Sequence, residues 1–382
     1  MTEKLKGRNF PNLRFPYYID EWKEQSLEDL GFFIGGGTPD TTNQQFWTGK
    51  IPWISSSDLS VDDIGRIFKT RFINDDAIKS SATKLVPKGG ILMVSRVGIG
   101  KFAIADEELC TSQDFTNLVT NQNAYFLCYY FSARSKDFVK LSQGTSIKGF
   151  TIQDIKSSVF PVPTLQEQEN ISSFLSVIDS RIRTQKKIIS HLQTSIRSYR
   201  DKLLSQKIRL NDEKGNNFPE WETKKIKHIL KIGSGRDYKH LDVGNIPVYG
   251  TGGVITFVNS FLYDGETVCI GRKGTIDKPM YCSGKLWTVD TLFYTHSFSN
   301  CIPKFIFQIF QSINWKEHNE ASGVPSLSKN TIENISITIP SIEEQIKIAN
   351  FLFSITEKIE TEKYILAQYE LQKKYLLANL FA

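Results

Sequence analysis

Two arginines stand in glycine-flanked turns at matching places in the two halves of the chain. Arg96 ends the stretch Lys88-Gly-Gly-Ile-Leu-Met-Val-Ser-Arg96, and Arg272 ends Asp264-Gly-Glu-Thr-Val-Cys-Ile-Gly-Arg272. An arginine on such a turn can enter a DNA groove and donate two hydrogen bonds to a guanine edge. The alternative is an ion pair with a nearby carboxylate. Because the feature recurs in both halves, we interpret both residues as DNA contacts.

Further basic residues lie in comparable loops, and their charges would suit DNA phosphates. For any one of them, a solvated surface charge is the alternative. They are Lys101, Lys148, Arg236, Lys239 and Lys273. Two more segments, Gly144-Thr-Ser-Ile-Lys-Gly149 and Ser322-Gly-Val-Pro-Ser326, occupy matching places later in each half. They are either contact loops or plain connections.

Motifs for catalysis are weak or absent in the sequence. Phe33-Ile-Gly-Gly-Gly37 fits F-x-G-x-G, which resembles the cofactor loop of adenine methyltransferases. The companion Asn-Pro-Pro-aromatic tetrapeptide occurs nowhere, and neither does a G-x-x-x-x-G-K-[ST] phosphate loop. The histidines show no metal-ligand spacing, and no nucleophile elbow is present. We therefore expect no catalytic residue, no metal site and no cofactor bound by this chain.

The composition is that of a soluble protein with two or three domains, at 382 residues. A net charge of +6 allows a polyanionic partner without requiring one. The five cysteines are scattered and form no C-x-x-C pair, which predicts reduced thiols. No apolar run approaches the roughly 20 residues of a membrane span. We expect a cytoplasmic protein that does not enter a membrane.

The chain also contains a long internal repeat. Pro163-Thr-Leu-Gln-Glu-Gln168 recurs as Pro340-Ser-Ile-Glu-Glu-Gln345, at an offset of 177 residues that persists along the following segment. Solenoid units recur every 20–50 residues or so, which is far shorter. The sequence therefore predicts a duplicated domain, each copy followed by a helix.

Each repeated motif opens a heptad stripe whose apolar residues recur at steps of three and four. Both stripes are interrupted at aligned polar positions, and the second also has Lys373 where the first has Ile196. A helix of nearly 40 residues spans about 55–60 Å, which favours packing of the two stripes on each other. The alternative is that each stripe docks only on its own domain. The predicted interface comprises Gln168, Ile171, Leu175, Ile178, Ile182, Gln185, Gln345, Ile348, Leu352, Ile355, Ile359 and Glu362.

These patterns predict an α+β fold. Two mixed β-rich domains would lie in a pseudo-twofold arrangement, separated by two long antiparallel coiled-coil helices. We expect a first domain with an N-terminal extension at 1–160, a helix at 161–210 and a linker at 211–220. A second domain follows at 221–338, and a second helix at 339–382.

Taken together, the motifs resemble the specificity subunit of type I restriction–modification systems, over the whole chain. The resemblance is carried by the two Pro-x-Leu/Ile-x-Glu-Gln helix starts and by three segments of the domains. Those segments are Gly36-Gly-Thr-Pro39, Ile51-Pro-Trp53 and Gly271-Arg-Lys-Gly274, the last together with Trp287 and Asp290.

The resemblance implies a non-catalytic subunit with two target-recognition domains. Each domain would bind one part of a bipartite, asymmetric site in double-stranded DNA. Two methyltransferase subunits would join it, followed by restriction subunits. S-adenosylmethionine, ATP and Mg would belong to those partner subunits.

Two alternatives remain from the residues themselves. One is a non-catalytic coiled-coil scaffold whose two β-rich domains bind proteins or glycans. The other is a methyltransferase that works alone. DNA binding would weaken steeply with added salt through counterion release, which separates it from the scaffold function.

Overall fold

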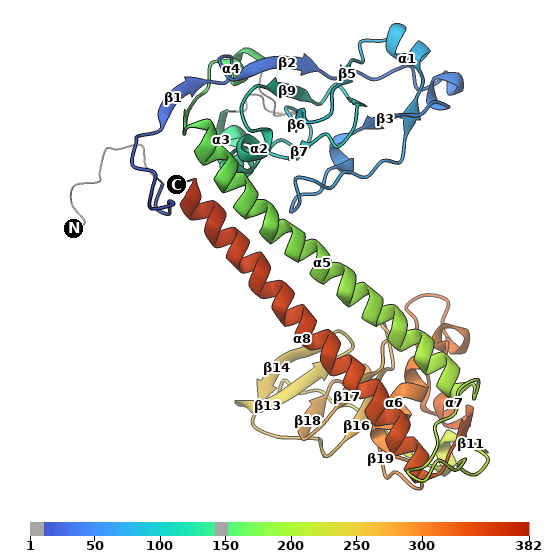
Figure 1. The fold of residues 1–382 in the computed structure, drawn as a ribbon. Helices are drawn as coiled ribbons and strands as arrows, with labels where there is room; N and C mark the ends of the chain where they lie inside the picture. The colour runs from blue at the N-terminus through green and yellow to red at the C-terminus, as the bar shows by residue number, and fades with distance from the viewer. Residues whose placement is uncertain (1–10, 142–151, 382) are drawn as a thin grey trace. The chain divides into compact units, whose positions relative to one another are not determined.

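We describe the protein from a computed structural model, and the structure describes residues 11–141 and 152–381 (Figure 1). The chain forms two compact units. Unit 1 comprises Met1–Lys186 and Ile365–Ala382, and unit 2 comprises Lys187–Tyr364. In the described residues, each unit contains a domain with three small sheets, together with segments of both long helices.

Three sheets form the domain of unit 1. β1 (Lys23–Ser26) pairs antiparallel with β10 (Val159–Val162), so the start of the domain is joined to its end. An antiparallel sheet has the order β2-β9-β6-β7, formed by Gly31–Gly35, Thr116–Thr120, Ile91–Met93 and Phe102–Ile104. The third has the order β4-β3-β8-β5, with β3 and β8 parallel, formed by Phe72–Ile73, Ile51–Ile54, Leu109–Thr111 and Leu85–Val86.

The domain of unit 2 repeats this topology strand for strand. β11 (Glu222–Lys225) pairs with β20 (Ser336–Ile339). The order β12-β19-β16-β17 is formed by Lys231–Ser234, Leu292–His296, Thr267–Gly271 and Met280–Cys282. The order β14-β13-β18-β15, with β13 and β18 parallel, is formed by Gly253–Val258, Val243–Gly250, Lys285–Thr288 and Tyr263–Asp264.

The domains also contain short helices. Unit 1 has α1 (Asp75–Lys79), α2 (Ala124–Ala133), α3 (Ser135–Leu141) and α4 (Ile152–Lys156), and unit 2 has α6 (Pro303–Ser312) and α7 (Lys329–Asn334). Among them, α2 packs on β7, α6 on β16 and β17, and α7 on β12. α2 begins where the Asn123 side chain accepts a hydrogen bond from the Phe126 backbone N–H. α6 instead has Pro303 at its first position, where a missing N–H costs nothing.

Two long helices follow the domains, α5 (Leu165–Leu204) and α8 (Ile342–Leu380). Unit 1 contains the start of α5 and the end of α8, whereas unit 2 contains the end of α5 and the start of α8. The helices therefore run in opposite directions. This confirms the predicted α+β fold with two β-rich domains and two long antiparallel helices.

In unit 1 the stripe of α5 packs in two directions at once. Ile171, Leu175, Ile178 and Ile182 belong to one buried cluster. The same cluster includes domain residues such as Trp22, Phe126 and Tyr130 and, from α8, Leu376 and Leu380. The stripe thus packs on its own domain and on the other helix, so the two arrangements that the sequence left open occur together.

The corresponding stripe of α8 lies in unit 2. Ile348, Leu352 and Ile359 are buried, and Ile355 is half-buried. The Tyr199 ring of α5 packs edge-to-face on Phe351, with centroids 5.4 Å apart. The two polar interruptions, Gln185 in unit 1 and Glu362 in unit 2, are buried as well, and Glu362 pairs with Lys358 at 2.6 Å.

Glu167, in the first turn of α5, is buried, and both of its carboxylate oxygens accept hydrogen bonds. Its carboxylate accepts hydrogen bonds from Arg14 Nε (2.7 Å) and Nη2 (2.8 Å) and from the Trp22 indole N–H (3.3 Å). A buried carboxylate needs such partners because its desolvation otherwise costs several kcal/mol. One side chain therefore ties the start of the helix to the start of the domain.

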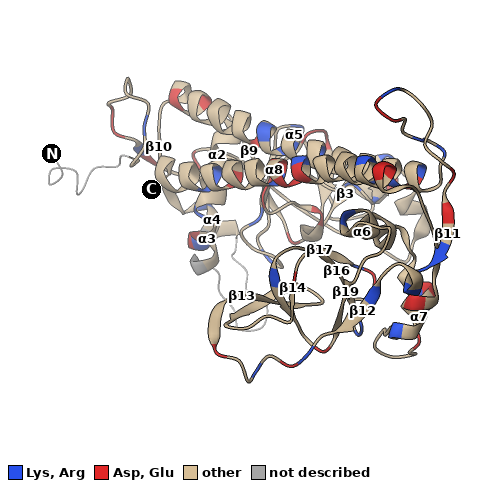
Figure 2. Cartoon of the chain, turned by 90° about the horizontal axis from the view of Figure 1, so that it is seen from below, with Lys and Arg blue, Asp and Glu red and all other residues tan. Residues whose placement is uncertain are grey.

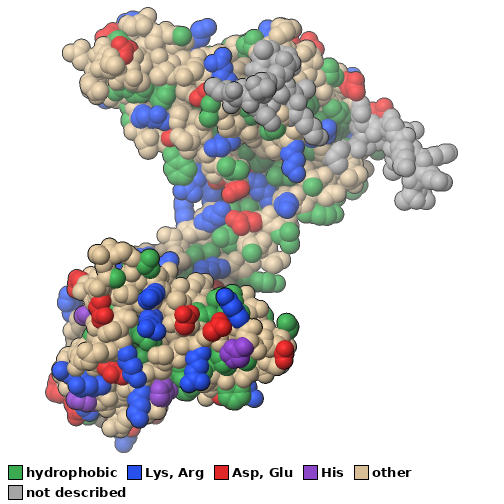
Figure 3. All heavy atoms as spheres, turned by 180° about the vertical axis from the view of Figure 1, so that it is seen from behind, with side chains coloured by type: hydrophobic (Ala, Val, Ile, Leu, Met, Phe, Trp, Pro, Cys, Tyr) green, Lys and Arg blue, Asp and Glu red, His purple; other side chains and the backbone are tan. Residues whose placement is uncertain are grey.

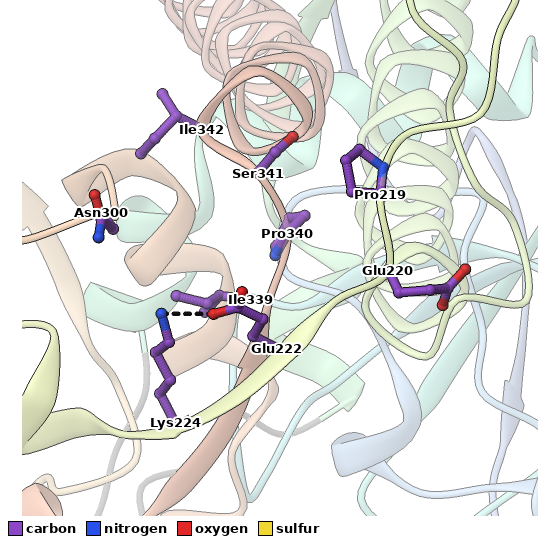
Figure 4. A pocket seen from close by; sticks show the side chains of 9 residues that line it. All are labelled: Pro219, Glu220, Glu222, Lys224, Asn300, Ile339, Pro340, Ser341 and Ile342. Atoms are coloured by element: carbon purple, nitrogen blue, oxygen red, sulfur yellow. Dashed lines mark ion pairs between the residues drawn. The ribbon is translucent and has the colours of Figure 1, made fainter.

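Glu344 plays the same part at the start of α8. It accepts from Arg209 Nη2 at 3.0 Å and from the Trp221 indole N–H at 3.1 Å. The hydrogen bond to Glu344 raises the pKa of Arg209. Figure 4 shows the pocket beside this junction, lined by Pro219, Pro340 and Ser341 among others.

The glutamines that follow these glutamates, Gln168 and Gln345, are buried and bond to their own domains. Each donates to the carbonyl of the proline that opens the motif, Pro163 (3.0 Å) or Pro340 (2.9 Å). Each also accepts the N–H just before the domain helix, from Asn123 or Ile302, at 3.0 Å. The two glutamines thus lie at the helix–domain junctions.

The segment at Leu13 contacts the end of α8. The Leu13 N–H donates to the Asn379 carbonyl at 2.9 Å. After α5, the Ile208 N–H donates to the Lys202 carbonyl at 3.1 Å, and Lys202 is the repeat partner of Asn379. The segment that precedes the first domain therefore contacts the end of α8 in the same way as the segment that precedes the second domain contacts the end of α5.

Lys373 interrupts the apolar stripe of α8 because it meets a buried carboxylate. Its ammonium lies 2.6 Å from Asp179 of α5, and their side chains are 12% and 3% exposed. Asp179 also accepts from the Tyr129 hydroxyl of α2 at 2.7 Å. Burial, together with Asp179, raises the pKa of Tyr129, so the hydroxyl stays protonated and donates.

Unit 2 connects its domain to a helix with different residues. Arg200 Nε of α5 donates to Gln308 Oε1 of α6 at 3.0 Å, and both side chains are buried. Burial lowers the pKa of Arg200. The two units therefore share the polar contacts at their helix–domain junctions but differ at this contact.

All five cysteines are buried and unpaired. Burial raises the pKa of Cys110 to about 12 and that of Cys301 to about 11, so neither is a thiolate at neutral pH. Within the described residues, no helix is both long enough and apolar enough to cross a membrane.

Asp179→Asn should lower the free energy of unfolding by about 3 kcal/mol, because it leaves Lys373 buried without a charged partner. Asp201→Asn, on an exposed part of the same helix, should change it by less than about 0.5 kcal/mol. Urea titration of both variants measures the difference. Equal losses in the two variants would contradict the buried triad.

Candidate nucleic-acid interface

In both units, the loop that follows β2 or β12 forms the same backbone hydrogen bonds to residues at the connection of β8 with β9 or of β18 with β19. Gly36 and Gly37 donate to Phe115 and Thr111 carbonyls, at 3.2 and 2.8 Å. In unit 2, Gly235 and Arg236 donate to Leu292 and Thr288 carbonyls, at 3.0 and 2.8 Å. Residues 36–37 and 235–236 are therefore structural equivalents.

A tryptophan indole supports this glycine loop in both units. Trp53 donates to the Gly37 carbonyl and Trp287 to the Arg236 carbonyl, each at 2.9 Å. The two tryptophans come from different strands, β3 and β18. The same support is thus built from residues that the sequence repeat does not align.

The hydrogen bonds correct the expected pairing of the two arginine turns. Ser95 and Arg96 both donate to the Asp114 carbonyl, at 2.8 and 3.3 Å. Arg272 and Lys273 donate in the same way to Thr291, at 2.8 and 3.3 Å. Arg96 is therefore equivalent to Lys273, and Ser95 to Arg272. Residues matched by these hydrogen bonds are 177 positions apart, which is also the offset between the two long helices. Matching Arg96 with Arg272 would make the offset one residue shorter.

In unit 2 the Arg272 turn joins the Ser322–Ser326 segment. The Gly274 N–H donates to Pro325 (2.8 Å), and the Leu327 N–H donates to Arg272 (2.9 Å). Together they border a cleft of about 320 Å³. It is lined by Ser234, Arg272, Lys273, Phe293, Glu320, Ser326, Leu327, Ser328 and Lys329. Two segments singled out from the sequence thus form one site.

The other predicted residues of unit 2 are close by. Arg236 and Lys239 are exposed on the loop after β12, and the Arg236 carbonyl is held by Trp287. This loop borders the same β18–β19 turn that anchors Arg272, because both bond to residues 288–292. Figure 3 shows Lys, Arg and His side chains spread over the face of unit 2 that it presents.

In unit 1 the predicted residues have different environments. Arg96 is exposed beside Gly98, whose φ of 91° lies in the left-handed region that favours glycine. Lys101 is half-buried and donates to the Ser56 carbonyl at 2.9 Å, so its charge is partly engaged by the protein. Lys148 and the Gly144–Gly149 segment lie outside the described residues.

The sequence reasoning missed Glu320 and Lys329, which line the cleft of unit 2. Glu320 stands two residues before the Ser322–Ser326 segment, and Lys329 three residues after it. Nearness to that segment could have pointed to both. Each resembled an ordinary solvated charge in sequence.

In the segment that fits F-x-G-x-G, Gly36 and Gly37 pack against the protein's own backbone, whereas nothing lies within 4 Å of a Cβ on Gly35. A Cβ on Gly36 would lie 1.9 Å from the Ser112 carbonyl oxygen, and one on Gly37 would lie 2.4 Å from the Thr83 nitrogen. Gly235 is equally tight, with the Val289 oxygen at 1.9 Å. Loop packing accounts for Gly36, Gly37 and Gly235. In the part of the chain that is described, no group of three or more His, Cys, Asp or Glu could hold a metal ion.

A comparison with protein families matches residues 19–194 and 219–371 to the family described as type I restriction modification DNA specificity domain. The chain belongs to this family. A specificity subunit is the non-catalytic component of a type I restriction–modification system.

Several proteins that are similar to this chain are specificity subunits of type I restriction enzymes. The chain is 31% identical over 231 residues to the type I restriction enzyme MjaIX specificity subunit of Methanocaldococcus jannaschii. That alignment covers 56% of this chain and 53% of the relative, so it spans about half of either protein. The EcoprrI specificity subunit of Escherichia coli is 24% identical, over 85% of this chain and 84% of that relative.

Solved structures share the fold of this specificity subunit. The crystal structure of a type I restriction–modification S subunit from M. genitalium has a TM-score of 0.67. It is 20% identical in sequence and covers 98% of this chain and 99% of that chain. At this identity the likeness supports the fold alone.

Gly36→Ala should lower the free energy of unfolding by about 2 kcal/mol or more, because its Cβ would collide with the backbone of the β8–β9 turn. Gly35→Ala is the matched control, since nothing lies within 4 Å of its Cβ. Thermal unfolding of the two variants measures the difference. A control that loses as much as Gly36→Ala would show that the loss comes from the strand and not from the collision.

Proposed function

We propose that this specificity subunit binds a bipartite, asymmetric site in double-stranded DNA, one part per domain. The support is that one frame occurs twice, with the same strand order and the same backbone contacts, while the loop residues differ. Arg272 with Lys273 in unit 2 stands where unit 1 has Ser95 with Arg96. Two copies of one frame with different contact residues suit two different half-sites.

We propose domain boundaries that follow the sequence pattern. The first target-recognition domain is 1–160 and the second 221–338. The helices at 161–210 and 339–382 and the linker at 211–220 join them. DNA contacts are assigned to Arg96, Lys101, Lys148, Arg236, Lys239, Arg272 and Lys273.

Two methyltransferase subunits are proposed to dock on the helices, and restriction subunits to join that complex. Large apolar side chains stay exposed on both helices, including Phe174 and Val177 on α5 and Leu371 and Tyr375 on α8. Exposed apolar faces are typical of interaction sites. Charges of both signs mark the same helices (Figure 2). S-adenosylmethionine, ATP and Mg belong to the partner subunits, and the complex is cytoplasmic.

Mapping of methylated adenines tests this function. DNA from cells that contain the chain and its cognate methyltransferase should carry methylation in one two-part motif with a fixed spacer. Cells with the methyltransferase alone are the control. Methylation that is absent, or that appears equally without the chain, would disprove the proposal.

The helices are proposed to set the spacer. One extra heptad in each helix, inserted between Lys186 and Lys187 and between Tyr364 and Ile365, adds about 10.5 Å, or about three base pairs. The mapped spacer should lengthen accordingly while both half-sites stay unchanged. An altered half-site with an unchanged spacer would contradict the helices as a ruler.

A further inference from the structure

The cleft of unit 2 combines hydrogen-bond donors with a charged acceptor. Arg272, Lys273 and Lys329 supply the donors, and Glu320 supplies the acceptor. Among the described residues, no carboxylate lies within ion-pairing distance of Arg272 or Lys273. The Arg272 guanidinium lies 5.9 Å from the centre of the Phe293 ring. Arg272 and Lys273 are therefore available to a ligand, whereas Lys329 pairs with Glu333 at 3.7 Å.

The Glu320 carboxylate is fixed by its own loop. Oε1 accepts from the Ser328 N–H at 3.2 Å and from the Thr331 hydroxyl. The Glu320 backbone N–H donates to the Ser326 carbonyl at 3.0 Å. Hydrogen bonds from Thr331 and Ser328 lower the pKa of Glu320, so it is ionised at neutral pH. Because both protein donors bond to Oε1, Oε2 can accept from a ligand.

This combination suits a base pair better than a phosphate. A phosphate needs donors only, and a fixed carboxylate in the same cleft would repel it. In the major groove a G·C pair presents guanine acceptors O6 and N7 beside the cytosine N4 amino donor. Arginine is the usual partner of guanine, and a carboxylate accepts from cytosine N4.

We propose that Arg272 and Glu320 together read one G·C base pair in the half-site bound by unit 2. Arg272 donates to guanine O6 and N7, and Glu320 accepts from cytosine N4. The inference rests on the proposed function and adds a specificity residue to it. In unit 1, Ser95 replaces Arg272, and its hydroxyl is within 3.0 Å of the Thr116 hydroxyl. Unit 1 therefore reads its half-site with other residues.

Glu320→Gln tests this reading in the full chain, through the methylation motif of cells that carry each variant. Glutamine can still accept from Ser328 and Thr331, so the loop is kept. It removes the charge that repels thymine O4, so discrimination between G·C and A·T should fall roughly tenfold or more at one position of one half-site. The other positions should not change. Glu317→Gln, three residues away and outside the cleft, is the matched control.

Arg272→Lys is the second variant, which keeps the charge but loses the paired donors. It should relax the same position as Glu320→Gln. An unchanged motif, a uniform fall in methylation at all sites, or two variants that relax different positions would each overturn the G·C reading. If the unaltered chain directs no methylation, the proposed function itself fails, which is a separate result.

Discussion

The fold depends on a buried carboxylate at the start of each long helix. Glu167 and Glu344 are almost completely shielded from water, and each is held by an arginine and a tryptophan. Removing one partner of a buried ion pair costs about 3–5 kcal/mol, so the arrangement tolerates little change. The arginine comes from the segment before the domain and the carboxylate from the segment after it. Together with the β1–β10 and β11–β20 pairs, this interaction joins the start of each domain to its end.

This closure explains how the loops can vary while the frame does not. The glutamate joins the helix to the start of the domain, and the next glutamine joins it to α2 or α6. At the far end, close-packed glycines, backbone hydrogen bonds and the indoles of Trp53 and Trp287 hold the turns. Side chains such as Arg272 and Lys273 are then free to change, because backbone hydrogen bonds hold the path of their turn. Glu320 differs, since its carboxylate bonds to Ser328 and Thr331 of its own loop.

The sequence predicted the parts that follow from periodicity and failed where strand register decides. Heptad spacing revealed both helices and the aligned interruptions at Gln185 and Glu362, since helix geometry repeats residue by residue. The turns that contain Arg96 and Arg272 were misaligned by one residue. The two arginines were matched because they are the same residue type, although the backbone hydrogen bonds keep the offset of 177 residues. Glu320 was missed because its role depends on Ser328 and Thr331, which bond to it only in the folded loop. The strand order could not be predicted from the sequence, because strands of 2–8 residues show little periodicity.

Lys373 is the position at which the two halves differ most clearly in their helices. Its repeat partner is the buried Ile196, and the equivalent of Asp179 is Thr356. Among the described residues, the Tyr129–Asp179–Lys373 triad therefore exists only where α8 meets the domain of unit 1. If the start of α8 met the end of another α8, Lys373 would be buried opposite Thr356 and would lose its charge partner. A buried polar group of this kind selects one pairing of helices over another. The triad thus favours packing of the end of α8 on the start of α5 over packing of two α8 helices on each other.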